Sequence, residues 1–402
     1  MEKEKRNIQW IVTSRMISRV GDIMFDVANN TFFVGINPRS LSLVAIYQSL
    51  ESLIGILFNL FGGVFADNFR RKKILVASNV FCGLACLLIS LISIEKWLVY
   101  AIILTNVFLA FMNAFSGPSY KAFTKEIVSQ DSITRLNSLL ETTSTMVKVS
   151  IPMIALFFYK KIGINGVLLL DGLSFLLAAL MLFFIVPINE EVSRKEKMSL
   201  VAIFDDLKIG FRYVYQHKTV FLIILLSALV NFFLAAYNLL LPYSSQVFTG
   251  LSDKLYGSFL TAEAIGGFIG AMLSSFVNKE LSSKSLMRFL ALSGLMLVLS
   301  APLYFFFHHT LLLAVSPALF SLFLAIFNIQ FFSIVQRDVD NQFLGRVFGI
   351  IFTVAILFMP IGTGFFSAIL NPRNTYNFCW IGTAVCLLAL VFEGLFKRYE
   401  VK

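Results

Sequence analysis

The chain has 402 residues, of which 58% are hydrophobic and only 14% are charged. A soluble domain needs more charge than this to cover its surface, so the composition excludes an ordinary soluble protein. The formal net charge of +10 could suit a nucleic-acid-binding protein. We attribute it to membrane topology instead, for the reasons below, and expect no nucleic-acid partner.

Apolar stretches of about 20 residues, the length that crosses a bilayer, recur along the chain. Helices satisfy their own backbone hydrogen bonds within hydrocarbon, so we predict an all-α membrane protein with twelve transmembrane helices. In chain order these spans are 8–33, 41–66, 73–94, 97–120, 135–159, 165–187, 219–245, 254–278, 285–307, 310–334, 343–370 and 375–396.

Positive charge is unevenly distributed over the predicted loops. Most of the 33 Lys and Arg residues lie on the side of the amino terminus, including the cluster at 70–73. Cytoplasmic loops retain such residues, so we predict that both termini are cytoplasmic in a multi-pass protein of the cell inner (cytoplasmic) membrane. The first span lacks a small-residue cleavage site and contains opposite charges, which argues against a signal peptide.

A charged linker divides the predicted spans into two sets of six. We expect a six-helix bundle at 1–188, a cytoplasmic linker at 189–218 and a second six-helix bundle at 219–402. Within the linker, Phe204 to Tyr215 has the pattern of an amphipathic helix that lies on the inner membrane surface.

The two predicted bundles share polar positions. When the halves are aligned, Glu51 meets Glu263, Arg19 meets Asn231 and Asp26 meets Asn238. Such a pattern is typical of a duplicated transporter fold, whose halves are related by an axis along the membrane normal. The charged residues of the first span are replaced by uncharged residues in the seventh span.

The loop between the second and third spans reads GGVFADNFRRKK. Here Gly63, Asp67, Arg71 and Lys72 match a loop motif of the major facilitator superfamily, which the sequence resembles. The resemblance implies two pseudo-symmetric six-helix bundles. It also implies that this loop latches the cytoplasmic gate of the outward-facing state.

Three further stretches are similar to the drug- and siderophore-exporter branch, which includes macrolide-efflux and enterobactin-exporter-like proteins. They are DGLSFLLAAL, DDLKIGFRYV and LGRVFGIIFTVAILFMPIG; the last contains Arg346, which we add to the gating residues. The fifth span has no glycine-rich antiporter motif. The branch implies a secondary transporter that works by alternating access.

Four charges in the first span share one face. At 100° per residue, Arg15, Arg19, Asp22 and Asp26 fall within about 60° of arc, so they face protein or water. Two hypotheses stay open: an ion-pair network that only holds the helix, or an acid that takes up and releases protons. Arg15 could also reach the inner interface.

Asp26 is the favoured proton-coupling residue, because it is the deepest acid of the stripe. Asp22, Glu51 and Glu263 are the other candidates; the last two lie within spans, where an acid is either neutral or paired. The alternative for both glutamic acids is a hydrogen bond that bridges helices.

Substrate contacts are expected from polar and aromatic residues of the cavity that the resemblance implies. Lys148 either neutralises one of the acids, which we favour, or meets an anionic group of the substrate. The candidates are Arg15, Arg19, Lys148, Asn29, Asn231, Tyr237, Asn238 and Phe115.

The sequence contains no phosphate-binding loop and no nucleophile constellation, so we predict a non-enzyme without a cofactor or metal. We expect a monomer that exports a hydrophobic or amphiphilic small molecule in exchange for protons, as in multidrug resistance by efflux. The alternatives are a lipid or lysolipid translocator, a siderophore or anion exporter, and a sensor or channel-like protein. The small-molecule substrate, protons and membrane lipid are the expected partners.

Overall fold

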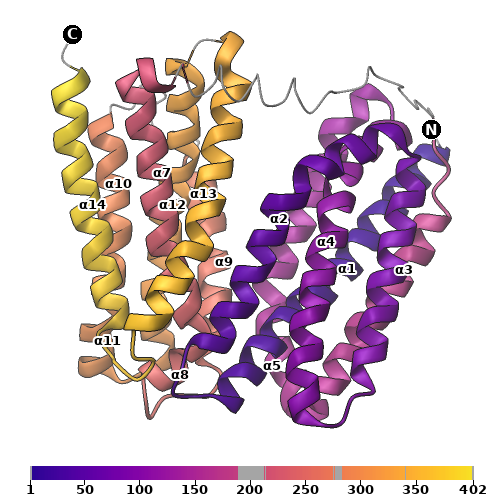
Figure 1. Ribbon diagram of the computed structural model, residues 1–402, viewed down its shortest axis with the longest axis horizontal. Helices are drawn as coiled ribbons and strands as arrows, with labels where there is room; N and C mark the ends of the chain where they lie inside the picture. Colours follow the sequence, from indigo (N-terminus) through magenta and orange to yellow (C-terminus); the bar gives the residue numbers. More distant parts are fainter. Residues whose placement is uncertain are drawn as a thin grey trace. The chain divides into compact units, whose positions relative to one another are not determined.

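The computed structural model describes residues 2–188, 212, 214–274, 276, 283–339 and 341–400. Within these ranges every regular element is a helix (Figure 1). The first half contains α1 (Glu2–Ile36), α2 (Ser42–Asn68), α3 (Arg71–Ser90), α4 (Glu95–Ile127) and α5 (Gln130–Phe183). The second half contains α7 (Lys218–Leu240), η1 (Leu241–Tyr243), α8 (Ser244–Val247), α9 (Leu255–Ser274), α10 (Ser283–Val298), α11 (Ser300–Phe307), α12 (Thr310–Asp338), α13 (Asn341–Ile369) and α14 (Asn377–Glu400).

Each of the twelve predicted spans is helical over most of its described residues, and four of them are joined, extended or divided differently from the prediction. The fifth and sixth spans form the single element α5, which turns at Gly163. Its φ of 67° favours glycine. The seventh span continues through η1 into α8, and the ninth is divided between α10 and α11.

Nine helices in the described part of the chain are long and apolar enough to cross a membrane. They do not include α1, whose stripe carries four charges, or α2, whose apolar part, Ser42–Phe58, is shorter. The prediction of an all-α membrane protein is confirmed. The predicted amphipathic helix at Phe204 to Tyr215 lies almost entirely outside the described residues.

The chain forms two compact units. Unit 1 comprises Met1–Ile36 and Leu50–Lys197, and unit 2 comprises Asn37–Ser49 and Met198–Lys402. The beginning of α2 therefore groups with unit 2, which the sequence had not indicated. There Tyr243 Oη donates a hydrogen bond of 2.7 Å to the carbonyl oxygen of Ser40.

Within unit 1, α5 packs against α1 and α3, and α3 packs against α4. Within unit 2, α9 packs against α12, α10 against α14 and α12, and α7 against α13 and α14. Figure 1 shows the long helices of each unit running side by side as a bundle. Each bundle thus buries its helix faces against neighbours of the same half.

The same close helix crossing occurs once in each unit. In unit 1, a Cβ added to Gly83 of α3 would lie 2.9 Å from the carbonyl oxygen of Gly172 of α5. In unit 2, a Cβ on Gly294 of α10 would lie 2.6 Å from the carbonyl oxygen of Gly382 of α14. Small residues permit such backbone contact in membranes. The matched crossings agree with a duplicated fold.

We expect Gly382→Ala to destabilise unit 2 by about 1–3 kcal/mol, because the new methyl group would meet the α10 backbone, which cannot move aside alone. Gly394→Ala on the same helix is the control, since no atom lies within 4 Å of its Cβ position. Thermal unfolding of the two purified variants in detergent measures the difference. Equal melting temperatures would contradict the close crossing.

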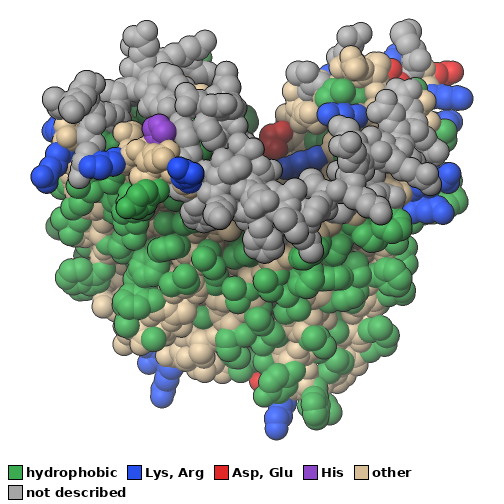
Figure 2. All heavy atoms as spheres, turned by 45° about the horizontal axis from the view of Figure 1, so that its top comes forward, with side chains coloured by type: hydrophobic (Ala, Val, Ile, Leu, Met, Phe, Trp, Pro, Cys, Tyr) green, Lys and Arg blue, Asp and Glu red, His purple; other side chains and the backbone are tan. Residues whose placement is uncertain are grey.

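Large apolar side chains cover the outside of both units. Leu88, Leu91, Phe306 and Leu311 are each more than 60% exposed. Figure 2 shows hydrophobic side chains over most of the visible surface of each unit, with Lys and Arg at its margins. Exposed apolar surface on this scale fits contact with lipid rather than with water.

Candidate functional site

The first helix of unit 1 has two distinct polar faces. The inner one carries small residues: Ser14, Ser18 and Gly21 are buried, and Ser14 Oγ donates to the carbonyl oxygen of Ala178 of α5 at 2.9 Å. The other is the predicted charged stripe. Small side chains on the inner face let α1 approach α5 closely.

Both arginines of the stripe have partners. Arg19 Nη1 lies 3.7 Å from Asp22 Oδ2, with the two side chains 35% and 20% exposed. The guanidinium of Arg15 lies over the ring of Tyr120 of α4, 4.7 Å from its centroid. Arg15 is thus bound within the unit by a cation–π contact, and Arg19 makes the predicted ion pair.

Three acids gather around Arg19. Asp26 is exposed, and Glu51 of α2 is exposed within electrostatic range of Asp26, Asp22 and Arg19. Asn29, further along α1, is buried. Like charges close together oppose full ionisation. The structure therefore brings the predicted proton-coupling acids of unit 1 into one group that can hold protons.

The remaining acid candidate lies in unit 2. Tyr237 Oη donates to Glu263 Oε2 at 3.4 Å, and the tyrosine is buried between Phe320 and Phe378. Asn238 follows Tyr237, and its carbonyl oxygen accepts from Gln48 Nε2 at 3.4 Å. Glu263 thus accepts a hydrogen bond that joins α9 to α7. A hydrogen bond that bridges helices was the alternative to a proton-coupling role for this residue.

Unit 2 contains a cavity of about 270 Å³ between α7, α12 and α13. Its polar groups come from Ser227, Asn231 and Asn328. Its apolar wall is formed by Val230, Phe327, Phe331, Phe332, Ile351, Phe352, Ala355 and Ile356. A mostly aromatic pocket with a few amide and hydroxyl groups suits an uncharged part of an amphiphilic ligand. Sequence reasoning found Asn231 but not Asn328.

Two of the predicted substrate-contact residues, Lys148 and Phe115, lie in different surroundings: Lys148 is exposed, and Phe115 packs among aromatic rings. Lys148 of α5 is exposed, and no acid in the described part of the chain forms an ion pair with it. The expectation that it neutralises a membrane acid therefore stays a prediction. Phe115 of α4 packs between Phe65 and Phe111, with ring centroids at 5.4 and 4.9 Å.

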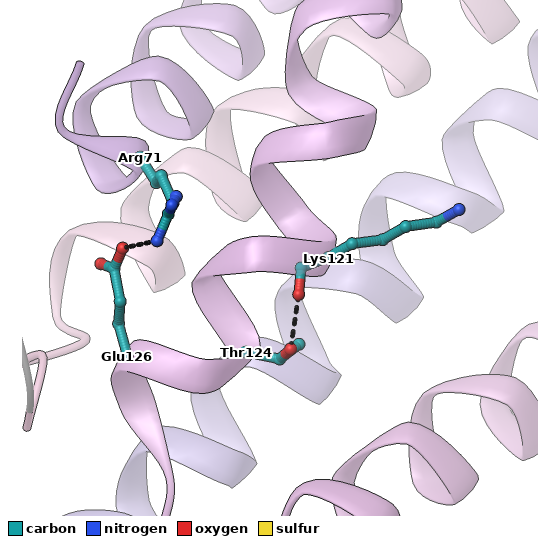
Figure 3. A network of polar contacts seen from close by, with 4 residues as sticks. All are labelled: Arg71, Lys121, Thr124 and Glu126. Atoms are coloured by element: carbon teal, nitrogen blue, oxygen red, sulfur yellow. Dashed lines mark hydrogen bonds and ion pairs between the residues drawn. The ribbon is translucent and has the colours of Figure 1, made fainter. Parts of the chain in front are cut away.

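Two basic residues of the predicted gating motif, Arg71 and Lys72, lie at the start of α3 and anchor it within unit 1. Arg71 Nη1 lies 2.6 Å from Glu126 Oε1 at the end of α4, and Lys72 Nζ donates to the carbonyl oxygen of Phe183 at 2.8 Å. Figure 3 shows Arg71 and Glu126 pointing toward each other, whereas Lys121 points away from them. Glu126 was not among the predicted site residues.

Three predicted gating residues, Gly63, Asp67 and Arg346, lie in α2 and α13, but their side chains are outside the described part of the structure. The neighbouring Gly62 explains the need for glycine here, because a Cβ on it would overlap the carbonyl oxygen of Ala114 of α4.

We expect Glu126→Gln to destabilise unit 1 by about 1–3 kcal/mol, because both side chains of the Arg71–Glu126 pair are less than 15% exposed and the arginine would lose its counter-charge. Glu393→Gln is the control: its partner Lys397 is 59% exposed, so no measurable change is expected. Thermal unfolding in detergent compares the two. An equal effect of both substitutions would contradict a structural role for the buried pair.

No group of three or more His, Cys, Asp and Glu side chains that could hold a metal ion occurs among the described residues. All four cysteines are free thiols.

The described residues form bundles of membrane-length helices, and the first helix carries a group of acids and arginines. The chain belongs to the Major Facilitator Superfamily, which matches residues 12–363. The predicted fold and family are thereby confirmed, and the protein is a transporter rather than an enzyme.

Relatives and solved structures agree with this assignment. Macrolide efflux protein A of Streptococcus pyogenes is 24% identical over 86% of each chain. Macrolide efflux protein A of Enterococcus faecalis is 24% identical over 77% of this chain and 97% of the relative. A bacterial homologue of the iron transporter ferroportin in an inward-facing state matches with a TM-score of 0.74 at 17% identity, covering 99% of both chains. These likenesses place the chain near drug-efflux members of the superfamily.

Proposed function

We propose that the protein exports a hydrophobic or amphiphilic small molecule of the macrolide type by alternating access, in exchange for protons. The observation that carries this proposal is the group of Asp22, Asp26 and Glu51 around Arg19. Acids that lie this close to one another and to an arginine can change their proton content as their surroundings change. Both termini and the charged linker lie in the cytoplasm, in accordance with the positive charge of the loops.

The relatives support the substrate class. Two of them are named macrolide efflux protein A. Macrolides are large and mostly apolar, and many carry one basic amine. The aromatic cavity of unit 2 suits the apolar part of such a molecule.

Export of an anion or siderophore is less well supported. Arginines without partners in unit 1 would support an anionic substrate. Instead, Arg19 contacts Asp22 and Arg15 lies over Tyr120. Lys148 is exposed and could meet an anionic group.

Counterflow of radiolabelled erythromycin in proteoliposomes tests whether the protein is a carrier for this class. A carrier accelerates exchange of labelled for unlabelled macrolide across the bilayer. Liposomes with the purified protein should exchange label much faster than empty liposomes. Equal rates would refute macrolide transport, and acceleration of a fluorescent lysolipid instead would identify a lipid translocator.

A further inference from the structure

Asp171 of α5 is an acid that the proposed exchange has not used. Its side chain is fully buried at 0% exposure, about two helical turns beyond Gly163. Cys86 Sγ of α3 donates to its Oδ2 at 3.3 Å, and Ser174 Oγ lies 3.5 Å from its Oδ1. Within the described residues, no Lys or Arg forms an ion pair with it.

The charges around Asp171 are of its own sign. Asp22 and Asp26 of α1 lie within electrostatic range of it, as does the thiol of Cys82 of α3, and the thiol of Cys86 contacts it directly. A carboxylate buried without a cation is costly, and a second acid nearby adds to the cost. A neutral carboxylic acid avoids both costs.

The hydrogen bonds around Asp171 accommodate that proton. Ser174 Oγ donates its own hydrogen to the Asp171 backbone oxygen at 2.8 Å, so its lone pairs are free to accept from a protonated Oδ1. The other carboxyl oxygen accepts from Cys86. The neutral acid therefore has both a donor and an acceptor partner.

Helix packing alone does not require an acid here. Asp171 directly precedes Gly172, which forms the close crossing with Gly83. In the matched crossing of unit 2, the residue that precedes Gly382 is Ile381, which is 4% exposed. An isoleucine thus occupies the equivalent place in a crossing of the same kind.

The position also connects Asp171 to the charged stripe of α1. A Cβ on Gly21 would overlap Asp171 Oδ1 and Ser174 Oγ, so α1 approaches α5 closely at this point. The next residue is Asp22, whose 3.7 Å contact with Arg19 is long for an ion pair. A small shift of α1 on α5 changes the distance between Asp22 and Asp171.

We propose that Asp171 is a second proton-exchanging carboxyl group of the transporter, which holds a proton in this conformation and passes it to Asp22 when α1 shifts. In that step the Asp171 O–H bond breaks and an O–H bond forms on Asp22. Asp22, which is partly exposed, then releases the proton to water, and Asp171 is reloaded by the reverse route. This role rests on the proton exchange proposed above.

Infrared difference spectroscopy of the purified protein tests the protonation of Asp171 without any substrate. At neutral pH the wild type should show a carboxylic acid C=O band that Asp171→Asn lacks. Cys86→Ala keeps the acid but removes its thiol donor, so it should shift the frequency of that band. The absence of a band that responds to either substitution would overturn the proposal.

Transport separates this role from packing. Asp171→Asn, an isostere, should keep erythromycin counterflow but lose stimulation by a pH gradient, and Asp171→Ile, the residue used in unit 2, should behave alike. Full stimulation in either variant would overturn the proposal. If both variants fail to accumulate, the band shift in Cys86→Ala decides. If the wild type itself ignores the pH gradient, the proposed function fails, whereas the infrared result still reports the state of Asp171.

Discussion

Asp26→Asn is expected to abolish macrolide uptake driven by a pH gradient while leaving the amount of protein in the membrane unchanged. Asp26 is exposed on α1 beside the Arg19–Asp22 pair, so an amide can occupy its place without loss of packing. The amide cannot take up a proton, and coupling through this residue is then lost. Uptake of radiolabelled erythromycin into inverted vesicles with an acidic interior gives the measurement.

Two controls accompany this substitution. Asp26→Glu restores a titrating group and should recover part of the uptake, whereas counterflow in Asp26→Asn should persist because it needs no net proton movement. Unchanged gradient-driven uptake in Asp26→Asn would contradict the assignment. The coupling role would then pass to Glu51 or Glu263.

Ala355→Phe is expected to raise the apparent KM for erythromycin about tenfold, equivalent to about 1.4 kcal/mol of binding free energy. Ala355 lines the aromatic cavity of unit 2, and a phenyl group there occupies space that the substrate would use. Initial rates of uptake over a range of erythromycin concentrations provide the apparent KM. The maximal rate should change less than the KM, because the acids of unit 1 are untouched.

Leu357→Phe on the same helix is the matched control, since Leu357 is 40% exposed and does not line the cavity. Its KM should equal that of the wild type. If Ala355→Phe leaves the KM unchanged while remaining folded, the cavity of unit 2 takes no part in substrate binding.

The helices and the charged stripe were predictable because both follow from local patterns. Apolar length defines the spans, and the 100° step between residues places Arg15, Arg19, Asp22 and Asp26 on one face. The turn at Gly163 falls between the predicted spans 135–159 and 165–187, because glycine permits a backbone conformation that interrupts a helix.

The partners of these residues were not predictable, because periodicity shows which face a side chain is on but not which helix lies opposite. The contact of Arg15 with Tyr120 joins α1 to α4, and that of Arg71 with Glu126 joins α3 to α4. The contact of Asp171 with Cys86, which joins α5 to α3, was not predictable for the same reason. In the matched crossing of unit 2 the place of Asp171 is taken by Ile381, and this comparison indicates that the crossing does not require an acid.

The exposure of Lys148 also depends on tertiary structure. A lysine within a span was expected to pair with an acid, because an unpaired buried ammonium is costly. In the structure Lys148 is exposed on the surface of unit 1. Its nearest acid in sequence, Glu141, is likewise exposed and two turns away.

Erythromycin uptake into inverted membrane vesicles, with and without a proton ionophore, tests proton-driven export most directly. We predict that an imposed acidic interior accelerates uptake and that the ionophore returns it to the rate of vesicles without the protein. Uptake that is carried by the protein but is equally fast with the ionophore would contradict proton exchange and, with it, the role of the acids around Arg19.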